Sequence, residues 1–252
     1  MTVPVAAPSI VRCGRVDSTQ AIVFALAAEG APDRTVVVAD SQTAGRGRRG
    51  RVWHDEPRAS LLASILLRPR LAPAQLSTLS LTAGVAVVEA LASATRLAPR
   101  LKWPNDVLVD GRKLAGILLE SRLGPELPAA PGASALQSAS IVALGIGINL
   151  AQRAFPPELA AHATSVRLAG GGDVDRDALL GVLLESLDRW RGRLETDGFA
   201  PVRMRWRALA DTLGRTVSVD GVTGVAVDVD DDGALLVDEG GRRRRVIAGD
   251  VG

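Results

Sequence analysis

The segment TAGRGRRGRVW, residues 43–53, combines glycine and arginine in a pattern that could bind an anion. Its letters G-R-G-R-R-G also match the dinucleotide fingerprint G-x-G-x-x-G, which needs a strand before it and a helix after it. The β-branched run at 34–40 predicts the strand. However, RVWHDEPRASLLASILLRP has no helical period and contains proline, and Arg68 and Arg70 lie where an acidic ribose ligand is expected. We therefore interpret the fingerprint match as accidental.

The same segment suits a loop that closes over an anionic ligand. Its glycines let the backbone approach a ligand closely. Arg46, Arg48, Arg49 and Arg51 offer planar forks for carboxylate and phosphate, and Trp53 offers a flat face for a base. The alternative is a solvated basic turn, but the mixture of glycine, arginine and tryptophan favours a ligand lid.

A second group is Lys102-Trp103-Pro104-Asn105-Asp106, followed by Lys113. Lys102 and Lys113 are the only lysines among 30 basic residues, and lysine differs from arginine in presenting a compact charge on a flexible stem. Adjacent Asn and Asp can hold a magnesium-bound triphosphate, or they can simply form a tight turn. Lys113 follows a hairpin signal and either points an ammonium into a cleft or lies exposed on a strand.

A third group is GIGIN at residues 145–149, at the end of an apolar strand. Its alternating glycines predict the close approach of a ligand or of another backbone segment. Asn149 could make a polar contact at the strand end.

Taken together, in this order, these motifs resemble the biotin–protein ligase family (biotin–[acetyl-CoA-carboxylase] ligases) of the type without an N-terminal DNA-binding domain. The resemblance covers about residues 17–149 and includes KLAGIL at 113–118. It implies an α/β (α+β) catalytic domain like that of class II aminoacyl-tRNA synthetases, with a mixed sheet and flanking helices, over residues 1–212. It also implies a small C-terminal SH3-like β-barrel over residues 213–252.

The resemblance further implies an ATP-dependent, AMP-forming reaction. Biotin is activated as biotinyl-5′-AMP and then transferred to a lysine of a biotin carboxyl carrier protein domain of an acyl-CoA carboxylase. Mg²⁺ is the implied cofactor, held mainly by the ATP phosphates and near Asp106. The arginines and lysines fit this reaction, because the biotin carboxylate must approach the phosphate of ATP and fixed positive charge cancels the repulsion between these two anions.

Residue roles follow from the same resemblance. Lys113 and Arg48 are the implied catalytic residues. The implied biotin-binding residues are Ser18, Thr19, Gln20, Gln42, Arg46, Gly47, Arg48, Lys113 and Gly116. The implied ATP and adenylate residues are Arg48, Arg49, Arg51, Trp53, Lys102, Asn105, Asp106 and Asn149. Gln20 departs from the family pattern, which usually has asparagine at this position.

The elements that must position these residues follow from local patterns. Asp17-Ser18-Thr19 and Gly30 predict a helix capped at both ends. The predicted strands are 34–40, 60–67, two strands within 100–121 around Asp110-Gly111, and 140–149; the predicted helices are 74–95, 173–195 and 201–213; residues 122–139 are predicted as a mobile loop, and short antiparallel strands follow from 215.

Composition limits the class of protein. The chain has 252 residues, 47% of them hydrophobic, and a net charge of +2. A single cysteine, Cys13, excludes disulfides, and one cysteine with two histidines, His54 and His162, argues against a Cys/His zinc site. No secretory signal is evident, and no apolar run reaches membrane-spanning length, the nearest being 59–67. We expect a cytoplasmic protein without a membrane partner.

Two rival functions would explain parts of this sequence. A lipoate–protein ligase would share the fold and the adenylation chemistry, but the arginine loop and Lys-Trp-Pro-Asn-Asp favour biotin. A transcription repressor would need a helix-turn-helix domain, for which a catalytic region beginning near Ser18 leaves no room. Net charge does not demand a nucleic-acid partner, and the run Arg242–Arg245 is typical of a solvated strand edge.

Overall fold

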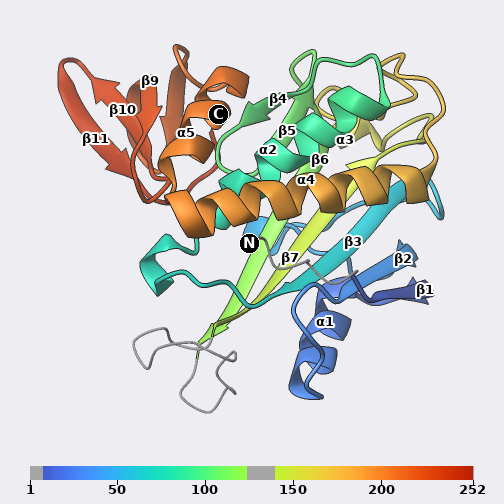
Figure 1. The fold of residues 1–252 in the computed structure, drawn as a ribbon. Helices are drawn as coiled ribbons and strands as arrows, with labels where there is room; N and C mark the ends of the chain where they lie inside the picture. Colours follow the sequence, from blue (N-terminus) through green and yellow to red (C-terminus); the bar gives the residue numbers. More distant parts are fainter. Residues whose placement is uncertain (1–7, 124–139, 252) are drawn as a thin grey trace. The chain divides into compact units, whose positions relative to one another are not determined.

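The computed structural model describes residues 8–123 and 140–251. They form a seven-stranded sheet of order β1-β2-β3-β7-β6-β5-β4 and a four-stranded sheet of order β11-β10-β9-β8 (Figure 1). The first sheet is mixed, as predicted, because β1 pairs parallel with β2 whereas β2 pairs antiparallel with β3. The chain divides into two compact units, Met1–Arg70 with Leu118–Gly147 and Leu71–Ile117 with Ile148–Gly252.

The first unit contains β1 (Ile10–Val16), α1 (Thr19–Ala28), β2 (Val36–Gln42) and β3 (Ser60–Leu67). The apolar side chains of α1 that pack the core are Val23, Phe24 and Ala27, which meet β2, β3 and β7. β3 is buried along its whole length, which explains its continuous apolar sequence. The strands predicted near 34–40 and at 60–67 are confirmed, whereas β1 was not predicted.

The ends of α1 differ in how far they follow the prediction. Ser18 occupies the N-cap position with extended φ of −157°, but its side chain makes no capping hydrogen bond. The predicted side-chain cap is therefore wrong. At the other end, Gly30 has a φ of 89°, and its N–H bonds Ala27 O. The predicted C′ glycine is confirmed because this left-handed conformation favours glycine.

β6 (Arg112–Leu123) and β7 (Ser140–Asn149) each pass from one compact unit into the other. The predicted hairpin between 100 and 121 is present: Asp110 and Gly111 have φ of 50° and 74° and join β5 to β6, as expected for a two-residue hairpin turn. The predicted first strand is in fact two, β4 (Arg100–Lys102) and β5 (Asp106–Val109), which pair antiparallel. Of the loop predicted at 122–139, residues 124–139 lie outside the described part.

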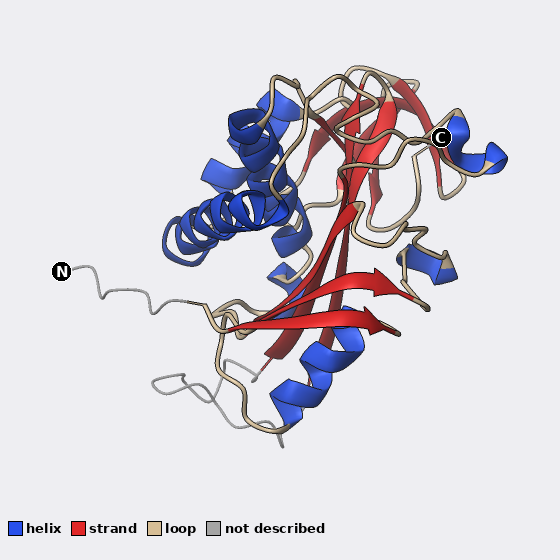
Figure 2. Cartoon of the chain, turned by 90° about the vertical axis from the view of Figure 1, so that its right-hand side faces the viewer, coloured by secondary structure: helices blue, strands red, loops and turns tan. Residues whose placement is uncertain are grey.

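In the second unit, α2 (Thr78–Ala94) packs against α4 (Arg176–Asp197) and α5 (Ala200–Leu209) and contacts β4 and β5. Figure 2 draws the helices and strands of the chain in separate colours. α3 (Pro157–Ala160) is a single turn. α4 begins later than predicted because Asp175 is its N-cap, accepting hydrogen bonds from Asp177 N at 2.9 Å and Ala178 N at 2.7 Å.

The prediction that no apolar run reaches membrane-spanning length needs correction. The helical stretch Pro73–Ala94 is long and apolar enough to span a bilayer by length and composition. However, 72% of its most apolar window is buried inside the protein. This burial is typical of a core helix, and α2 indeed provides the centre of the second unit's packing against α4 and α5.

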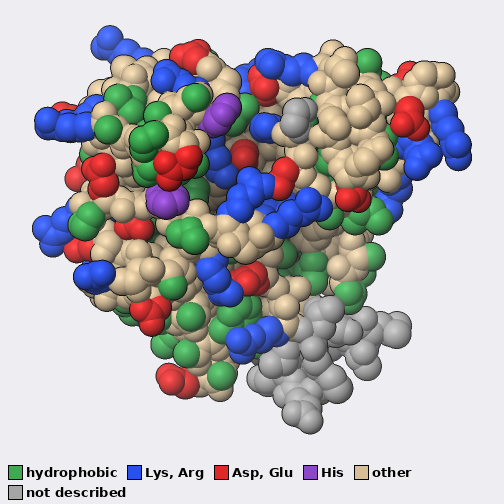
Figure 3. Space-filling view, turned by 180° about the vertical axis from the view of Figure 1, so that it is seen from behind, with side chains coloured by type: hydrophobic (Ala, Val, Ile, Leu, Met, Phe, Trp, Pro, Cys, Tyr) green, Lys and Arg blue, Asp and Glu red, His purple; other side chains and the backbone are tan. Residues whose placement is uncertain are grey.

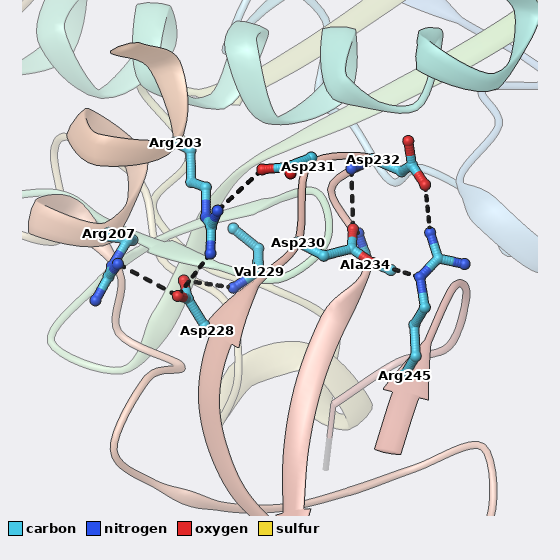
Figure 4. Close-up of polar contacts among 9 residues, drawn as sticks. All are labelled: Arg203, Arg207, Asp228, Val229, Asp230, Asp231, Asp232, Ala234 and Arg245. Atoms are coloured by element: carbon cyan, nitrogen blue, oxygen red, sulfur yellow. Dashed lines mark hydrogen bonds and ion pairs between the residues drawn. The ribbon is translucent and has the colours of Figure 1, made fainter. Parts of the chain in front are cut away.

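The C-terminal sheet consists of β8 (Thr216–Val219), β9 (Val222–Val229), β10 (Leu235–Glu239) and β11 (Arg242–Val246), all antiparallel. Figure 4 shows how arginines hold its acidic turn. Arg203 of α5 binds Asp228 at 2.8 Å and Asp231 at 3.0 Å, and Arg245 binds Asp230 and also Asp232 at 2.7 Å. The Arg242–Arg245 run thus lies on an edge strand, as expected, with Arg245 serving this turn.

Candidate ligand-binding site

The arginine-glycine loop of the first unit is a short hairpin. Arg46 forms an isolated antiparallel bridge with Val52, Gly47 N donates to Arg51 O at 2.7 Å, and Trp53 N donates to Gly45 O at 3.0 Å. The tip, Arg48–Gly50, is one 3₁₀ turn. Because the next element is the strand β3 and not a helix, the rejection of a dinucleotide loop is confirmed.

The arginines of this loop differ in exposure. Arg46, Arg49 and Arg51 are exposed and Arg48 is half-buried. Arg46 Nη2 lies 2.8 Å from Oε2 of Glu120 on β6. A hollow of about 640 Å³ lies beside α1 and is lined by Ser18, Ala21, Phe24, Ala25, Ala28, Ala44, Arg46 and Glu120–Arg122. Of the predicted biotin residues in this unit, only Ser18 and Arg46 line this hollow.

The first turn of α1 makes a second polar set. Thr19 N and Thr19 Oγ1 both donate to Gln42 Oε1, at 2.8 and 3.1 Å. Thr19 Oγ1 also lies 2.7 Å from Ser64 Oγ on β3. The structure therefore brings together two of the predicted biotin residues, Thr19 and Gln42, and fixes which end of the Gln42 amide faces the helix.

The alternating glycines of β7 are explained by two side chains from other motifs. A Cβ on Gly145 would lie 3.1 Å from Gln20 Cδ, and a Cβ on Gly147 would lie 2.7 Å from Trp53 Cζ2. Both separations are shorter than ordinary carbon–carbon contact. The groups that approach these glycines are the side chains of Gln20 and Trp53, and not the backbone segment that the sequence suggested.

In the second unit, Lys113 and Asp106 form an ion pair. Lys113 Nζ lies 2.7 Å from Asp106 Oδ1, and the two side chains are 33% and 22% exposed. The Lys113 backbone is held by His162 O at 2.7 Å and by Thr164 N at 2.9 Å. Gly116 lies opposite Asp106 in the β5–β6 ladder. Lys113 therefore presents a partly exposed ammonium next to one carboxylate.

The turn between β4 and β5 is fixed on both sides. Trp103 is buried, and its Nε1 donates to Gly233 O at 3.0 Å while its N–H donates to Thr212 Oγ1 at 2.9 Å. Asn105 Nδ2 donates to Ile117 O at 2.9 Å. Half-buried Lys102 lies opposite Asp106 in the β4–β5 ladder.

Asn149 is placed differently from the other predicted nucleotide residues. It is buried, its Nδ2 donates to Thr164 O at 3.0 Å, and its Oδ1 accepts from Gln152 Nε2 at 3.2 Å. These bonds use one of the two amide hydrogens and one lone pair of the amide oxygen. The structure therefore gives Asn149 a role in holding the end of β7.

Sequence reasoning missed Glu120, Ser64 and Asp55. Asp55 Oδ2 accepts from Gln42 N at 3.3 Å, and burial raises the pKa of Asp55 above its ordinary value despite that bond and the nearby His54. Glu120 follows the KLAGIL motif, and its position on β6 was the signal that could have paired it with a loop arginine. Ser64 lies within a continuous apolar run, which hides its polar role.

The described residues contain no group of three or more His, Cys, Asp or Glu side chains that could hold a metal ion. Asp106, the carboxylate expected near a metal, is paired with Lys113. The donor set therefore fits a divalent ion that arrives with phosphate ligands better than one held in a protein cage.

Comparison with known proteins first defines a class. Residues 13–129 match the model of the Biotin/lipoate A/B protein ligase family, and residues 212–251 match the Biotin protein ligase C terminal domain. A biotin protein ligase from Aquifex aeolicus in complex with biotin and ATP superposes with a TM-score of 0.80 at 29% identity, covering 97% of both chains.

Curated relatives narrow this class. The biotin–[acetyl-CoA-carboxylase] ligase of Paracoccus denitrificans is 39% identical over 92% of this chain and 95% of its own length. The biotin–[acetyl-CoA-carboxylase] ligase of Mycobacterium tuberculosis is also 39% identical, over 93% of this chain and 85% of its own length. The Bacillus subtilis bifunctional ligase/repressor BirA is 34% identical, over 93% and 70%. The chain belongs to the biotin–[acetyl-CoA-carboxylase] ligase family, and it is an ATP-dependent ligase that acts on biotin.

Proposed function

We propose that this ligase forms biotinyl-5′-AMP and transfers the biotinyl group to one lysine of a biotin carboxyl carrier protein domain of an acyl-CoA carboxylase. In the first step a biotin carboxylate oxygen attacks the α-phosphorus of ATP and pyrophosphate leaves. In the second step the lysine amine attacks the acyl carbon and AMP leaves. The observation that carries the proposal is the arginine hairpin beside the Thr19–Gln42 polar set, in one compact unit.

The chemistry asks mainly for positioning and positive charge. Arg48 is proposed to neutralise the biotin carboxylate and the α-phosphate, and Lys113 is proposed to bind the same kinds of oxygen. Arg48 begins a 3₁₀ turn, and Lys113 lies on the strand β6, which is hydrogen-bonded to β5. Positive charges that are already in place need little rearrangement when a negatively charged transition state forms.

Biotin's ureido head needs acceptors for two N–H groups and a donor for one carbonyl. We propose that Ser18, Thr19 and Gln42 meet this need, with Arg46, Gly47 and Gly116 nearer the chain that carries the carboxylate. The bonds from Thr19 to Gln42 Oε1 leave the Gln42 nitrogen directed away from the helix, toward Gly45 of the loop. This orientation supports a donor role for Gln42.

ATP is proposed to bind through Arg49, Arg51, Trp53, Lys102, Asn105 and Asp106. Asn149 is also proposed to lie on the nucleotide side, since its bonds to Thr164 and Gln152 use only one amide hydrogen and one oxygen lone pair. Mg²⁺ is proposed to enter with ATP, held mainly by phosphate oxygens. When bound it would supply charge neutralisation of the triphosphate, and Asp106, which is paired with Lys113, is the protein carboxylate proposed to lie near it.

We further propose a cytoplasmic location, supported by the lone Cys13. The domain boundary is proposed at residues 212–213, supported by the start of the C-terminal family match at residue 212. Repressor activity is not proposed, because the net charge of +2 provides little general attraction for DNA.

The test is biotin-dependent exchange of pyrophosphate into ATP, compared with lipoate as the alternative acid. Wild-type protein should exchange with biotin and not with lipoate. Arg48→Ala should slow exchange by about 10²-fold or more, as expected when one charge-stabilising donor is removed. It should also release preformed biotinyl-5′-AMP faster.

The matched control is Arg58→Ala, an exposed arginine that binds Asp40 outside the loop at 3.0 Å. It should exchange like wild type. Exchange with lipoate but not biotin would reject the proposed substrate, and wild-type exchange by Arg48→Ala would reject the proposed role of the arginine.

A further inference from the structure

Gln20, which stands where the family usually has asparagine, makes contacts that differ from those of a simple ligand-binding residue. It is 4% exposed. Its Nε2 donates to Leu118 O on β6 at 3.0 Å and to Ala143 O on β7 at 3.1 Å. One amide nitrogen therefore joins two neighbouring strands to the first turn of α1, and both of its hydrogens are used in doing so.

The neighbouring residue Thr19 completes this arrangement. It bonds Gln42 at the end of β2 and Ser64 on β3. Two successive side chains of α1 thus reach four different strands of the first unit. Thr19 and Gln20 link α1, which begins beside the residues proposed to bind the ureido head of biotin, to these four strands. A shift of any of the four strands would therefore move the proposed site.

Gly145 gives independent evidence that the Gln20 amide needs its present place. A Cβ on Gly145 would lie 3.1 Å from Gln20 Cδ, 3.3 Å from Nε2 and 3.4 Å from Cγ. Gly145 is not among the glycines with a positive φ. The lack of space for a side chain, and not the backbone conformation, therefore explains why this residue is glycine. The space that a Cβ would take is occupied by the carboxamide.

We propose that Gln20 is a positioning residue that sets β6 and β7 for biotin binding, and that Gly145 is glycine because the Gln20 carboxamide packs on it. This assigns Gln20 an indirect role in place of the direct biotin contact implied by the resemblance. A glutamine reaches both carbonyls at this distance from the helix, whereas an asparagine, shorter by one methylene, would withdraw its nitrogen from them. The inference rests on the proposed biotin site.

The experiment measures the biotin Kd by calorimetry and the KM for ATP in pyrophosphate exchange. Gln20→Met keeps the length of the side chain but removes the donor, leaving two carbonyls without their partner. It should weaken biotin binding about tenfold, the effect of losing one or two buried hydrogen bonds. The KM for ATP should stay at the wild-type value, which a general loss of structure would not allow.

The coupling between the two positions gives a sharper test. Gly145→Ala should weaken biotin binding about tenfold in the wild-type background, because its Cβ displaces the carboxamide. In the Gln20→Asn background, Gly145→Ala should weaken biotin binding by less than about twofold, because the shorter asparagine leaves room for the added Cβ. Gly181→Ala on α4 is the matched control, since nothing lies within 4 Å of its Cβ, and it should bind biotin like wild type.

Equal costs of Gly145→Ala in both backgrounds would overturn the inference, as would wild-type biotin affinity in Gln20→Met. Circular dichroism and the thermal midpoint confirm folding of each variant, and Gln20→Asn serves if Gln20→Met fails to fold. If the wild-type protein binds no biotin, the proposed function fails. In that case the Gln20–Gly145 coupling is still read from the thermal midpoints, so the two failures are distinguishable.

Discussion

At the scale of single residues, Lys113 shows what a scarce residue type can mean. It is one of two lysines in a basic set of 30 residues. Its ammonium lies 2.7 Å from Asp106 Oδ1, so a compact point charge sits beside one carboxylate and is partly exposed. A guanidinium is broader and planar and would meet the same oxygens at a different distance. Shape, and not charge alone, is the physical reason we offer for lysine.

Lys113→Arg is therefore expected to fold normally but to form biotinyl-5′-AMP about 10²-fold more slowly, approaching Lys113→Ala. The measurement is single-turnover formation of the adenylate at saturating biotin and ATP. Arg112→Lys, the neighbouring basic residue on β6, is the matched control and should keep the wild-type rate. A wild-type rate for Lys113→Arg would mean that the site requires only a positive charge.

At the scale of elements, several strands and helices were predictable because burial imposes a pattern on the sequence. β3 was predicted at its observed bounds, since all eight of its residues are buried and apolar or small. The β5–β6 hairpin was predictable because Asp110-Gly111 is a strong local turn signal. β1 was missed because its exposed edge carries Arg12 and Arg15 and its interior contains glycine, so it lacks an apolar run.

The sequence could nominate residues for the candidate site but could not predict their contacts. The motifs located the loop, the lysine and the glycines. The partners depend on which strands become neighbours, and sequence separation hides this: Gln20 bonds residues 98 and 123 positions away. The same reason explains why Glu120 was missed as the partner of Arg46, and why Trp103 could not be recognised as a buried donor to Gly233.

Three helices of the second unit meet at one carboxylate, Glu89 of α2. Its Oε2 accepts from Arg189 at 2.7 Å and from Trp190 Nε1 at 2.8 Å on α4, and its Oε1 accepts from Arg205 on α5 at 2.8 Å. Burial alone would raise the pKa of Glu89, but the hydrogen bonds from Trp190, Arg205 and Arg189 outweigh burial and lower it below its ordinary value of 4.5. The folded state therefore favours the ionised form.

Glu89→Gln should lower the free energy of unfolding by about 1 to 3 kcal/mol at neutral pH, because bonds to a charged acceptor are lost. A lowered folded-state pKa gives a stability contribution that is complete above pH 4.5 and is lost as pH falls through the folded-state value. The difference between wild type and variant in urea unfolding should thus shrink below pH 4.5.

Glu185→Gln, which removes an exposed carboxylate from α4, the helix that carries Arg189 and Trp190, is the control for removing one negative charge. It should change stability by less than about 0.5 kcal/mol at any pH. A Glu89→Gln deficit that stays constant as the pH falls would show that the cluster contributes through packing and not through ionisation.

At the scale of the whole molecule, the C-terminal sheet is tied to the motif Lys-Trp-Pro-Asn-Asp within one compact unit. Trp103 donates to Gly233 O in the β9–β10 turn, and Ser77 Oγ donates to Asp232 O at 2.6 Å. The acidic turn is itself held by Arg203 and Arg245. A sheet that could have been an independent appendage therefore contributes to the position of the residues proposed to bind ATP.

The charge of the whole chain leads to the last prediction. Thirty basic residues are nearly balanced by 28 acidic ones, and both signs are interspersed over the face in Figure 3. Duplex binding draws its affinity largely from phosphate contacts that release counterions, which needs a basic surface. After rounds of selection from a random duplex pool at physiological salt, no sequence should be enriched, and any binding should be weaker than about 1 μM and should fall steeply with added salt. Sub-micromolar, sequence-selective binding would instead mean that this ligase also acts as a repressor.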